Sequence, residues 1–380
     1  MPSRRDLLLG SAAAAAALGL TALPAPPALG LTAPPARAAA GHPRPFGRHG
    51  SPAARRTPRT LYADPHGRGD VTTVQAAVDA ATGTGWTLVL AAGTYRETVT
   101  VPAALTGMTW LGATDDARDV TIVYDNAAGT PKPDGSGPYG TSGSATATLK
   151  ADGFTAQGIT FANDWLRAAH PGVIGTQAVA AKVLGDRSAF LGCRFLGHQD
   201  TLYADTASLT VFARQYYARC YVEGDVDFVF GRATAVFEGC EFRTLNRTDL
   251  AAPPYGFVFA PSTAVADPRG YLVTACRVTG EAPAASYKLA RPWVPSSDPT
   301  ARPMLTVRDT WLGRTVDAAA PYTDMSAAHP WQSQRFAEHH DRGPGAAIPF
   351  PANRPQLTGA QARTATREAH LGDWAPWRHR

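Results

Sequence analysis

Two aspartates occupy equivalent positions in two similar segments of the sequence. Asp200 follows Cys193 by seven residues in AFLGCRFLGHQD, and Asp227 follows Cys220 by seven residues in QYYARCYVEGDVD, so the segments repeat after 27 residues. If the segments are successive turns of one coil, the two carboxylates lie on adjacent strands, about 4.8 Å apart. Carboxyl groups this close titrate as a coupled pair, and one holds its proton more tightly. A protonated acid beside an ionised carboxylate is what cleavage of an ester or a glycoside needs.

A repeating β-structure must position these aspartates, and the sequence contains a weak repeat. Six segments consist of a short apolar run, a small or polar corner residue and a second apolar run. The corners fall at Gly158, Cys193, Cys220, Cys240, Cys276 and Asp309, at intervals of 35, 27, 20, 36 and 33 residues. Periods of this length with variable insertions favour an all-β parallel β-helix, a solenoid whose coils stack their strands.

An antiparallel β-sandwich is the alternative architecture. It would need tight Asn-Gly or Asp-Gly hairpins. The only such pairs are Asp134-Gly135 and Asp152-Gly153. Short apolar runs without intervening amphipathic helices argue against a βαβ fold.

Helices are expected only at the two ends of the folded part. Residues 72–81 predict the first, with Thr72 and Gln75 as a capping box and Val74, Ala77 and Val78 on one face. The chain becomes loop-rich from about Pro321. A second capping box, Thr358 with Gln361, predicts a closing helix near 358–370 that covers one end of the solenoid or packs along its side. Glu338, His339 and His340 are expected on a solvated face.

The first forty residues read as an export signal rather than as part of the fold. Arg4 and Arg5 precede an apolar run from Leu7 to Leu20, and small residues follow up to Ala40. The paired arginines favour the twin-arginine route, with cleavage near Ala38 or Ala40 and a secreted product. A membrane anchor is the alternative, but the run is shorter than the ~20 residues that span a bilayer.

Residues 41–60 form a basic arm that we expect to be disordered, since they hold five arginines and no acidic residue. The whole chain has a net charge of +5. Residues 1–40 carry three arginines and one aspartate, so their removal leaves +3, and without the arm the folded body is near −2. The arm could touch acidic polymers, yet nothing in the body resembles a nucleic-acid-binding module.

The four cysteines all fall at the repeated corner. Export permits a disulfide, and adjacent coils bring Cα atoms close enough for one. Of the three pairings that four cysteines allow, we favour Cys220–Cys240, the shortest interval, with Cys193 and Cys276 as small buried fillers. The sequence has no CxxC or HExxH motif, so no metal site is expected.

Six motifs in order resemble those of the pectin methylesterases over about Leu61 to Gly372: GTSGSAT, GTQAVA, QDTLY, GDVDFVFG, LARPW and FAEHHDRGPGA. The resemblance implies a right-handed parallel β-helix with short peripheral helices, occupying residues 61–380. It also implies a pectinesterase (EC 3.1.1.11), which demethylates methyl-esterified homogalacturonan to pectate and methanol without a metal, cofactor or serine nucleophile. The chain indeed has no G-x-S-x-G elbow. We expect a monomer whose partner is the polysaccharide, with no nucleic-acid or membrane partner.

The resemblance also assigns catalytic roles to five residues. Asp227 would be the nucleophile, and Asp200 the acid that protonates methanol and then the base that activates water. Gln177 and Gln199 would donate hydrogen bonds to the oxyanion of the tetrahedral intermediate. Arg291 would keep Asp227 ionised and contact the substrate.

Six residues are expected to bind the substrate. The resemblance assigns Gln177, Arg291 and Thr141, whereas Trp293, Phe230 and Tyr203 are chosen because they lie two or three residues from the proposed catalytic groups. The aromatic rings would provide flat platforms for sugar faces. Two departures from the family pattern are visible. Ala290 replaces the usual glycine before Arg291, and its methyl group would restrict a positive φ. The arm is also too short for an inhibitor-like N-terminal domain.

Two other classes of function remain to be weighed. A β-helix polysaccharide lyase would bind calcium through acids such as Asp200, Asp225 and Asp227. A catalytically silent glycan-binding solenoid would release no methanol. An acyl thioesterase on the same scaffold is a further, lesser alternative.

Overall fold

The computed structural model describes residues 59–378. The predicted export signal at 1–40 and residues 41–58 of the basic arm lie outside this range. Thr60, which the sequence assigned to the arm, instead begins strand β1 (Thr60–Ala63), because it pairs in register with Thr87 of β2 (Thr87–Leu90). The folded body therefore starts one residue earlier than predicted.

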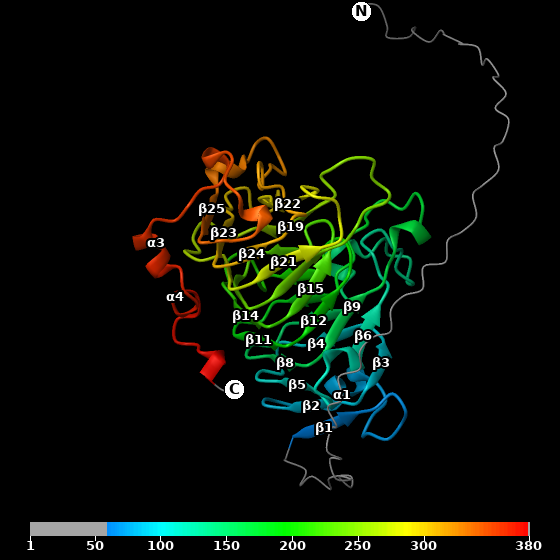
Figure 1. The fold of residues 1–380 in the computed structure, drawn as a ribbon. Helices are drawn as coiled ribbons and strands as arrows, with labels where there is room; N and C mark the ends of the chain where they lie inside the picture. The colour runs from blue at the N-terminus through cyan, green and yellow to red at the C-terminus, as the bar shows by residue number, and fades with distance from the viewer. Residues whose placement is uncertain (1–58, 379–380) are drawn as a thin grey trace, which may run out of the picture. The chain divides into compact units, whose positions relative to one another are not determined.

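Each complete coil contributes one strand to each of three parallel sheets, which we call sheets A, B and C, and the coils at the two ends contribute fewer (Figure 1). Sheet A contains β1, β2, β5 (Thr109–Gly112), β8 (Thr155–Gln157), β11 (Ser188–Leu191), β14 (Arg214–Ala218), β17 (Thr234–Glu238), β20 (Tyr271–Thr274), β23 (Met304–Arg308) and β25 (Arg335–His339). Sheet B contains β3 (Gly93–Arg96), β6 (Val120–Tyr124), β9 (Thr160–Asn163), β12 (Arg194–Leu196), β15 (Tyr221–Gly224), β18 (Glu241–Thr244), β21 (Arg277–Gly280) and β24 (Trp311–Leu312). Sheet C contains β4 (Val99–Val101), β7 (Ala147–Leu149), β10 (Ala181–Val183), β13 (Leu202–Ala204), β16 (Val229–Gly231), β19 (Gly256–Pro261) and β22 (Tyr287–Ala290).

All pairings between these strands are parallel, and successive coils stay in register; Leu202 of β13, for example, pairs with Val229 of β16. The predicted right-handed parallel β-helix is confirmed. The antiparallel sandwich is wrong for the described residues, because every pairing between their strands is parallel and none forms a hairpin.

A left-handed backbone position at the turn from sheet A to sheet B explains the sequence repeat. Six residues there have φ between 52° and 64°: Gly158, Gly192, Arg219, Gly239, Ala275 and Asp309. The residue after each points into the core, and these residues are Ile159, Cys193, Cys220, Cys240, Cys276 and Thr310. The predicted repeat aligned Gly158 and Asp309 with the four cysteines. The structure instead aligns the residues that follow them, Ile159 and Thr310, with the cysteines.

The predicted Cys220–Cys240 disulfide is wrong, since all four cysteines are buried free thiols. Cys220 donates its Sγ hydrogen to Phe190 O at 3.3 Å, and Cys240 donates to Tyr217 O at 3.3 Å. Stacked side chains on parallel coils point in the same direction, whereas a disulfide needs Cβ vectors that converge. All four cysteines therefore serve as small buried fillers, as was expected of Cys193 and Cys276.

Stacked aromatic rings run through the interior of the central coils. Phe190 stacks on Tyr217 with ring centroids 5.0 Å apart, and Tyr217 stacks on Phe237 at 4.7 Å. Phe161 stacks on Phe195 at 5.5 Å. Ring pairs of this kind contribute about 0.5–1.5 kcal/mol each beyond their buried area. This rigid interior fixes the spacing of the coils and hence of the groups carried on their outer faces.

Helix α1 (Val74–Ala80) packs against β1 and β4 at the N-terminal end of the solenoid. Its predicted buried face, Val74, Ala77 and Val78, is confirmed. The predicted capping box is wrong by one residue, because Thr73 caps the helix and the carboxylate of Glu97 accepts hydrogen bonds from the first backbone N–H groups.

The predicted closing helix is instead two short helices, α3 (Gly359–Thr364) and α4 (Arg367–Leu371). The capping box of Thr358 and Gln361 is confirmed. Helix α4 packs on β14 and β17, along the side of the solenoid. The remaining helical turns are α2 (Gly140–Gly143), η1 (Ala117–Asp119), η2 (Arg167–Ala169), η3 (Trp331–Ser333), η4 (Pro344–Ala346), η5 (Pro351–Asn353) and η6 (Pro376–Arg378).

The predicted solvated face near Glu338 is only partly right. His340 is exposed, but Glu338 is buried and accepts hydrogen bonds from both Arg354 and Tyr322. Successive side chains of β25 point to opposite faces, and Glu338 shares the buried face with Phe336.

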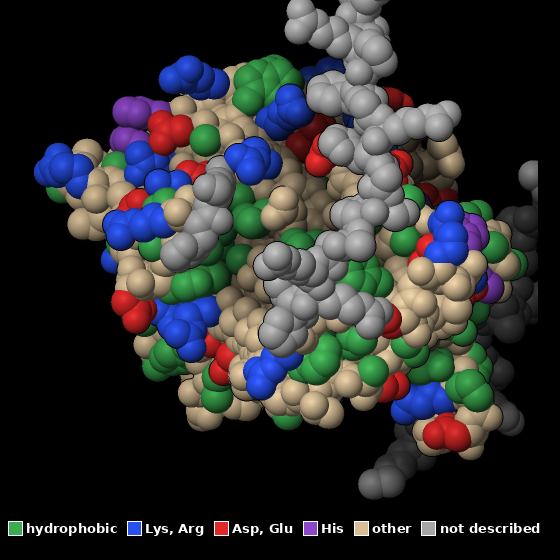
Figure 2. Space-filling model, turned by 90° about the horizontal axis from the view of Figure 1, so that it is seen from below, with side chains coloured by type: hydrophobic (Ala, Val, Ile, Leu, Met, Phe, Trp, Pro, Cys, Tyr) green, Lys and Arg blue, Asp and Glu red, His purple; other side chains and the backbone are tan. Residues whose placement is uncertain are grey.

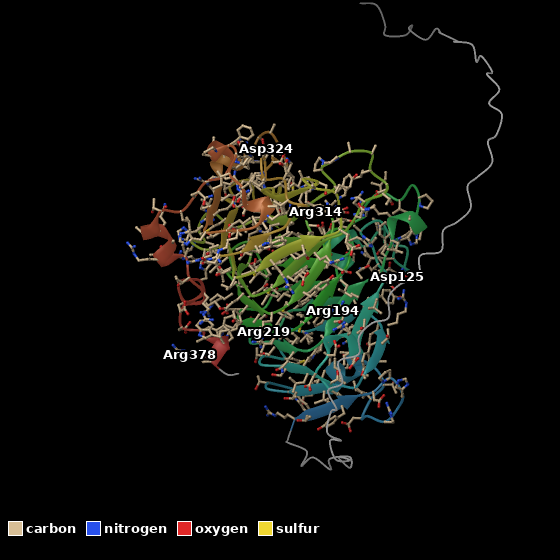
Figure 3. All side chains as sticks on the ribbon, in the orientation of Figure 1. Asp125, Arg194, Arg219, Arg314, Asp324 and Arg378 are labelled. Carbon is tan, nitrogen blue, oxygen red and sulfur yellow. The ribbon has the colours of Figure 1, made fainter. Side chains whose placement is uncertain are left out.

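The described surface in Figure 2 shows basic, acidic and hydrophobic side chains interspersed. Arg194 and Arg219, labelled in Figure 3, border one hollow together with Tyr221. Between residues 59 and 378, no helix has both the length and the apolar character to cross a membrane.

Candidate active site

Asp200 and Asp227 occupy the same position on consecutive coils, each two residues before a strand of sheet C. The backbone N–H of Asp200 donates to Val226 O at 3.0 Å, which ties the two loops together. Both aspartates have positive φ values, 67° and 50°. Such a conformation costs roughly 1–3 kcal/mol for a residue other than glycine and is concentrated at functional sites.

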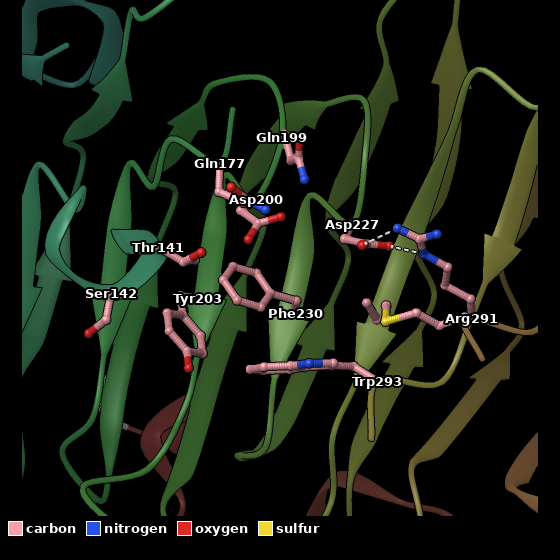
Figure 4. A pocket seen from close by; sticks show the side chains of 12 residues that line it. Thr141, Ser142, Gln177, Gln199, Asp200, Tyr203, Asp227, Phe230, Arg291 and Trp293 are labelled. Atoms are coloured by element: carbon pink, nitrogen blue, oxygen red, sulfur yellow. Dashed lines mark hydrogen bonds and ion pairs between the residues drawn. The ribbon is translucent and has the colours of Figure 1, made fainter. Parts of the chain in front are cut away.

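All nine residues predicted for catalysis or substrate binding line one cavity of about 350 Å³ (Figure 4). They are Thr141, Gln177, Gln199, Asp200, Tyr203, Asp227, Phe230, Arg291 and Trp293. The sequence reasoning missed three further lining residues, Ser142, Ala260 and Met325. The cavity lies on the outer face of sheet C, where side chains from several coils converge.

Arg291 holds the carboxylate of Asp227 in a bidentate pair. Its Nε donates to Oδ1 at 2.8 Å and its Nη2 donates to Oδ2 at 2.6 Å. The guanidinium also lies over the ring of Phe257, 3.8 Å from the centroid. Ala290 lies in β22 and is not among the residues with positive φ, so its methyl group does not strain the approach of Arg291.

The pKa values of the two aspartates are both raised by burial, but only Asp227 has a bound arginine that opposes this effect. Burial and the nearby charge of Asp227 raise the pKa of Asp200 well above its usual value. Burial also raises the pKa of Asp227, but its two hydrogen bonds from Arg291 act in the opposite direction. Because Asp200 has no such guanidinium bound to it, Asp227 ionises first and Asp200 keeps the shared proton.

Two side-chain amides face the same space. Thr176 Oγ1 donates to Gln199 Oε1 at 2.6 Å, which leaves the amide nitrogen of Gln199 directed into the cavity (Figure 4). Within residues 59–378, the side-chain amide of Gln177 has no hydrogen-bond partner in the protein, while its backbone oxygen accepts from Ala128 N at 2.7 Å. Both amides are therefore available to a ligand in the cavity.

Aromatic rings form the floor of the cavity beside the aspartates. Tyr203 and Phe230 are in register on β13 and β16, and their rings stack with centroids 4.1 Å apart. Trp293 is tilted against both rings, at 6.1 and 5.7 Å. Thr141 enters the cavity from the short helix α2.

A buried charge cluster behind the aspartates was not predicted. Asp225 is fully buried and accepts two hydrogen bonds from Arg167, at 2.6 and 2.7 Å. His198 Nδ1 lies 3.2 Å from the same carboxylate, and Val226 N donates to it at 2.7 Å. Although burial opposes it, hydrogen bonding to Arg167 and His198 holds the pKa of Asp225 well below its usual value.

This cluster joins the two loops that carry Asp200 and Asp227, because His198 lies two residues before Asp200 and Asp225 lies two residues before Asp227. The sequence offered only a partial signal for it. Asp225 is part of GDVDFVFG and was considered only as a calcium ligand, whereas Arg167 belongs to no motif and comes from η2, 58 residues before Asp225.

The family model named Pectinesterase matches residues 62–371. The chain belongs to the pectinesterase family. The pectinesterase of Ralstonia solanacearum is 31% identical over 334 residues, which cover 79% of this chain and 83% of that protein. Pectinesterase A of Dickeya chrysanthemi is 32% identical over 320 residues, covering 77% and 84%.

Solved pectinesterase structures agree with the sequence matches. Pectin methylesterase PemA from Erwinia chrysanthemi superimposes with a TM-score of 0.73 at 30% identity, covering 84% of this chain and 98% of that one. A pectin methylesterase in complex with a hexasaccharide has a TM-score of 0.74 at 29% identity, with the same coverage.

As a pectinesterase, the protein is a carboxylic ester hydrolase. This family membership favours ester hydrolysis over the lyase and glycan-binding alternatives. In the described part of the chain, no group of three or more His, Cys, Asp or Glu side chains is arranged to hold a metal ion. The acids considered for calcium are also engaged elsewhere, Asp225 by Arg167 and Asp227 by Arg291.

Proposed function

We propose that the protein demethylates methyl-esterified homogalacturonan to pectate and methanol, with Asp227 as nucleophile and Asp200 as acid and base. The observation that carries this proposal is the contrast within one cavity between a carboxylate bound by arginine, Asp227, and a buried carboxyl group without such a partner, Asp200. A nucleophile must be ionised and an acid must hold a proton, and these surroundings favour that division.

The first half of the reaction forms an acyl-enzyme. A carboxylate oxygen of Asp227 attacks the ester carbonyl carbon, and the carbonyl oxygen becomes an oxyanion. The amides of Gln177 and Gln199 donate to that oxyanion, a contribution typically worth about 10²–10³ in rate per donor. The bond to the methoxy oxygen then breaks, Asp200 protonates the departing group to methanol, and a mixed anhydride with Asp227 remains.

The second half returns the enzyme to its starting state. Asp200, now a carboxylate, takes a proton from water as the water oxygen attacks the substrate carbon of the anhydride. The bond to Asp227 breaks and leaves its carboxylate ionised beside Arg291. The net change is one ester and one water converted to one acid and one methanol.

The polysaccharide substrate is supported by the cavity floor and by the relatives. Trp293, which is only partly buried, offers an apolar face to a sugar ring, whereas Tyr203 and Phe230 stack on each other and support it from below. A structural relative is described as a pectin methylesterase bound to a hexasaccharide. We further propose that the protein acts outside the cell as a monomer, after export through the signal predicted in residues 1–40, by the twin-arginine route.

The test measures methanol released from highly methylated homogalacturonan and, in parallel, the ultraviolet absorbance of an unsaturated product. The proposal predicts methanol, no unsaturated product and full activity in EDTA. An absorbance increase that EDTA abolishes would establish the lyase instead. Polysaccharide binding without methanol or unsaturated product would establish a silent glycan-binding protein.

A further inference from the structure

The outer face of sheet B carries a row of large side chains that the candidate active site does not use. The row runs in register over six consecutive coils, and its members are Arg194 of β12, Tyr221 of β15, Glu241 of β18, Arg277 of β21, Trp311 of β24 and Arg342 on the next coil. Neighbours in the row are about 4.8 Å apart. The strands β12, β15, β21 and β24 follow one another through the middle of Figure 1. None of these six residues lines the cavity on sheet C.

Trp311 is the most prominent apolar side chain of this row, and 45% of its surface is exposed. A Cβ atom at Gly343 would lie 2.9 Å from Trp311 Nε1, and a Cβ atom at Gly313 would lie 3.1 Å from Trp311 Cζ3. The two ends of the indole therefore rest on backbone that carries no side chain, so the ring lies along the surface. An indole held in this way offers a flat apolar face on which a sugar ring packs.

Arginines stand on both sides of Trp311 in the row. Arg277 precedes it by one coil and is paired with Glu241, at 2.9 Å from Nη2 to Oε2. Arg342 follows it by one coil, is exposed, and forms no ion pair with any residue that the structure describes. A guanidinium group binds a carboxylate through two parallel hydrogen bonds, so Arg342 is suited to an acidic group carried by a sugar that lies on Trp311.

The other end of the row has the same combination of an aromatic ring and an unpaired cation. The guanidinium of Arg194 lies over the ring of Tyr221, 5.2 Å from its centroid. Arg219 is exposed beside them and borders the same hollow, and neither arginine forms an ion pair within residues 59–378. Three arginines and two aspartates border this hollow, so its net charge is positive.

The distance between the two ends indicates the kind of ligand. Tyr221 and Trp311 are three coils apart in the row, which corresponds to about 14 Å. A ligand that reaches both ends must therefore be extended, and it must carry several negative charges to satisfy Arg342 and Arg194. An acidic polysaccharide with one carboxylate on each sugar has both properties.

We propose that the outer face of sheet B is a second polysaccharide-binding surface, centred on Trp311, which holds demethylated stretches of the polymer away from the cavity where the ester reacts. The choice of polygalacturonate as the occupant rests on the proposed function, whose product it is. A methylated stretch is neutral and would leave Arg342 and Arg194 unbalanced, whereas the product would pair with both. The surface would thus keep the enzyme on polymer that it has already begun to demethylate.

The test uses Trp311→Ala, Trp311→Phe and Arg342→Gln, with two matched controls. Phe212→Ala removes an aromatic ring of similar exposure, 44%, from the loop between β13 and β14. Arg363→Gln removes an exposed arginine from α3. Because the cavity also binds polymer, each change is made in the wild type and in a Trp293→Ala background, which weakens binding in the cavity. Binding to immobilised unesterified polygalacturonate is measured together with methanol release from a short methylated oligogalacturonide.

The Trp293→Ala protein should still bind polygalacturonate, and adding Trp311→Ala should weaken that binding at least about tenfold. Arg342→Gln should weaken it about tenfold, and raising the salt concentration should reduce this difference. Trp311→Phe keeps an aromatic face and should stay within about threefold, and both controls should match their parent. In the wild-type background, Trp311→Ala should release methanol from the short oligomer within about twofold of the normal rate, because the cavity is intact.

Equal polygalacturonate binding with and without Trp311→Ala would overturn the inference. An equal loss in the Phe212→Ala control, or a parallel loss of methanol release from the short oligomer, would also overturn it, because the effect would then not be specific to this surface. If light scattering shows a dimer that Trp311→Ala dissociates while polygalacturonate binding is unchanged, the face is an interface between copies of the chain and the inference fails.

The outcome is separable from that of the proposed function, because binding of unesterified polymer needs no turnover. If the wild type releases no methanol but its polygalacturonate binding depends on Trp311, the esterase proposal fails and the second surface stands. If methanol is released and Trp311→Ala binds polygalacturonate normally in both backgrounds, the esterase stands and the second surface fails.

Discussion

Arg291 donates two hydrogen bonds to Asp227, at 2.8 and 2.6 Å, from the end of a strand that lies two coils further along sheet C. Asp200 lies on the adjacent coil without a comparable partner, and its pKa is raised well above the usual value by burial and by Asp227. This asymmetry between two otherwise equivalent aspartates is the reason that we propose Asp227 for attack and Asp200 for proton transfer.

Replacing Arg291 should move the acid limb of the pH–rate profile. Arg291 opposes the effect of burial on the pKa of Asp227, so Arg291→Gln raises that pKa further. Because the reaction needs ionised Asp227, the acid limb of kcat/KM should shift to higher pH, and Arg291→Lys should shift it less. An unmoved acid limb with lower activity at every pH would mean that Arg291 acts only on the substrate.

Asp225→Asn should damage both catalysis and stability, since it leaves the half-buried Arg167 without its charge partner and removes the buried carboxylate that joins the two loops. Breaking a buried ion pair from one side typically costs about 3–5 kcal/mol, measurable by urea unfolding. The double variant Asp225→Asn/Arg167→Gln should recover part of that stability without recovering activity, because the loops that carry Asp200 and Asp227 still lose the carboxylate that joins them. Additive losses in the double variant would refute the coupling of these two residues.

Thr176→Val should lower kcat about tenfold with little change in KM. The hydroxyl of Thr176 fixes which end of the Gln199 amide faces the cavity, so its loss weakens a donor that acts on the oxyanion. Thr176→Ser keeps the hydroxyl and should restore most of the rate. A rise in KM alone would place Thr176 in substrate binding instead.

Asp341→Asn should stabilise the fold, and increasingly so as the pH rises from about 4 to 8. Burial raises the pKa of Asp341 to about 8, and its Oδ2 has no hydrogen-bond partner, while Thr310 N donates to Oδ1. Between the unfolded and folded pKa values the folded state binds more protons, so wild-type stability falls with rising pH.

Urea unfolding at several pH values measures this effect. The gain should reach at least about 1 kcal/mol at pH 7, since one pKa unit corresponds to about 1.4 kcal/mol. It should nearly vanish below pH 4, where Asp341 is protonated in both states. A gain that does not depend on pH would show that Asp341 does not titrate in this way.

The sequence predicted which residues line the candidate active site because they stand in short motifs on consecutive coils. Asp200 and Asp227 are each positioned by a few neighbouring residues, and the shared spacing after Cys193 and Cys220 already implies equivalent places. Once the coils stack in register, Tyr203 and Phe230 must also meet.

Features that depend on the direction of a side chain, or on a partner distant in the sequence, could not be predicted from the sequence. Cys220 and Cys240 are equivalent residues on adjacent coils, but only the structure shows that their side chains run parallel. The turn from sheet A to sheet B is defined by a left-handed backbone conformation. Gly192, Arg219 and Ala275 all adopt it, so no single residue type identifies the turn in the sequence.

The remaining differences between the prediction and the structure come from ion pairs between residues far apart in the sequence. Arg167 reaches Asp225 from a turn outside every motif. Glu338 is buried by Arg354, which approaches from a loop after β25. Neither partner follows from local periodicity.

The central claim is tested most directly by methanol release from methyl-esterified homogalacturonan by the wild type, Asp227→Asn, Asp200→Asn and the double variant, each checked for its fold by circular dichroism. If Asp227 is the nucleophile and Asp200 its acid and base, each single variant should lose at least about 10³ in kcat. The double variant should lose little more than the worse single one, because the two act as a unit. Correctly folded Asp227→Asn that keeps more than about a tenth of wild-type kcat would contradict the account.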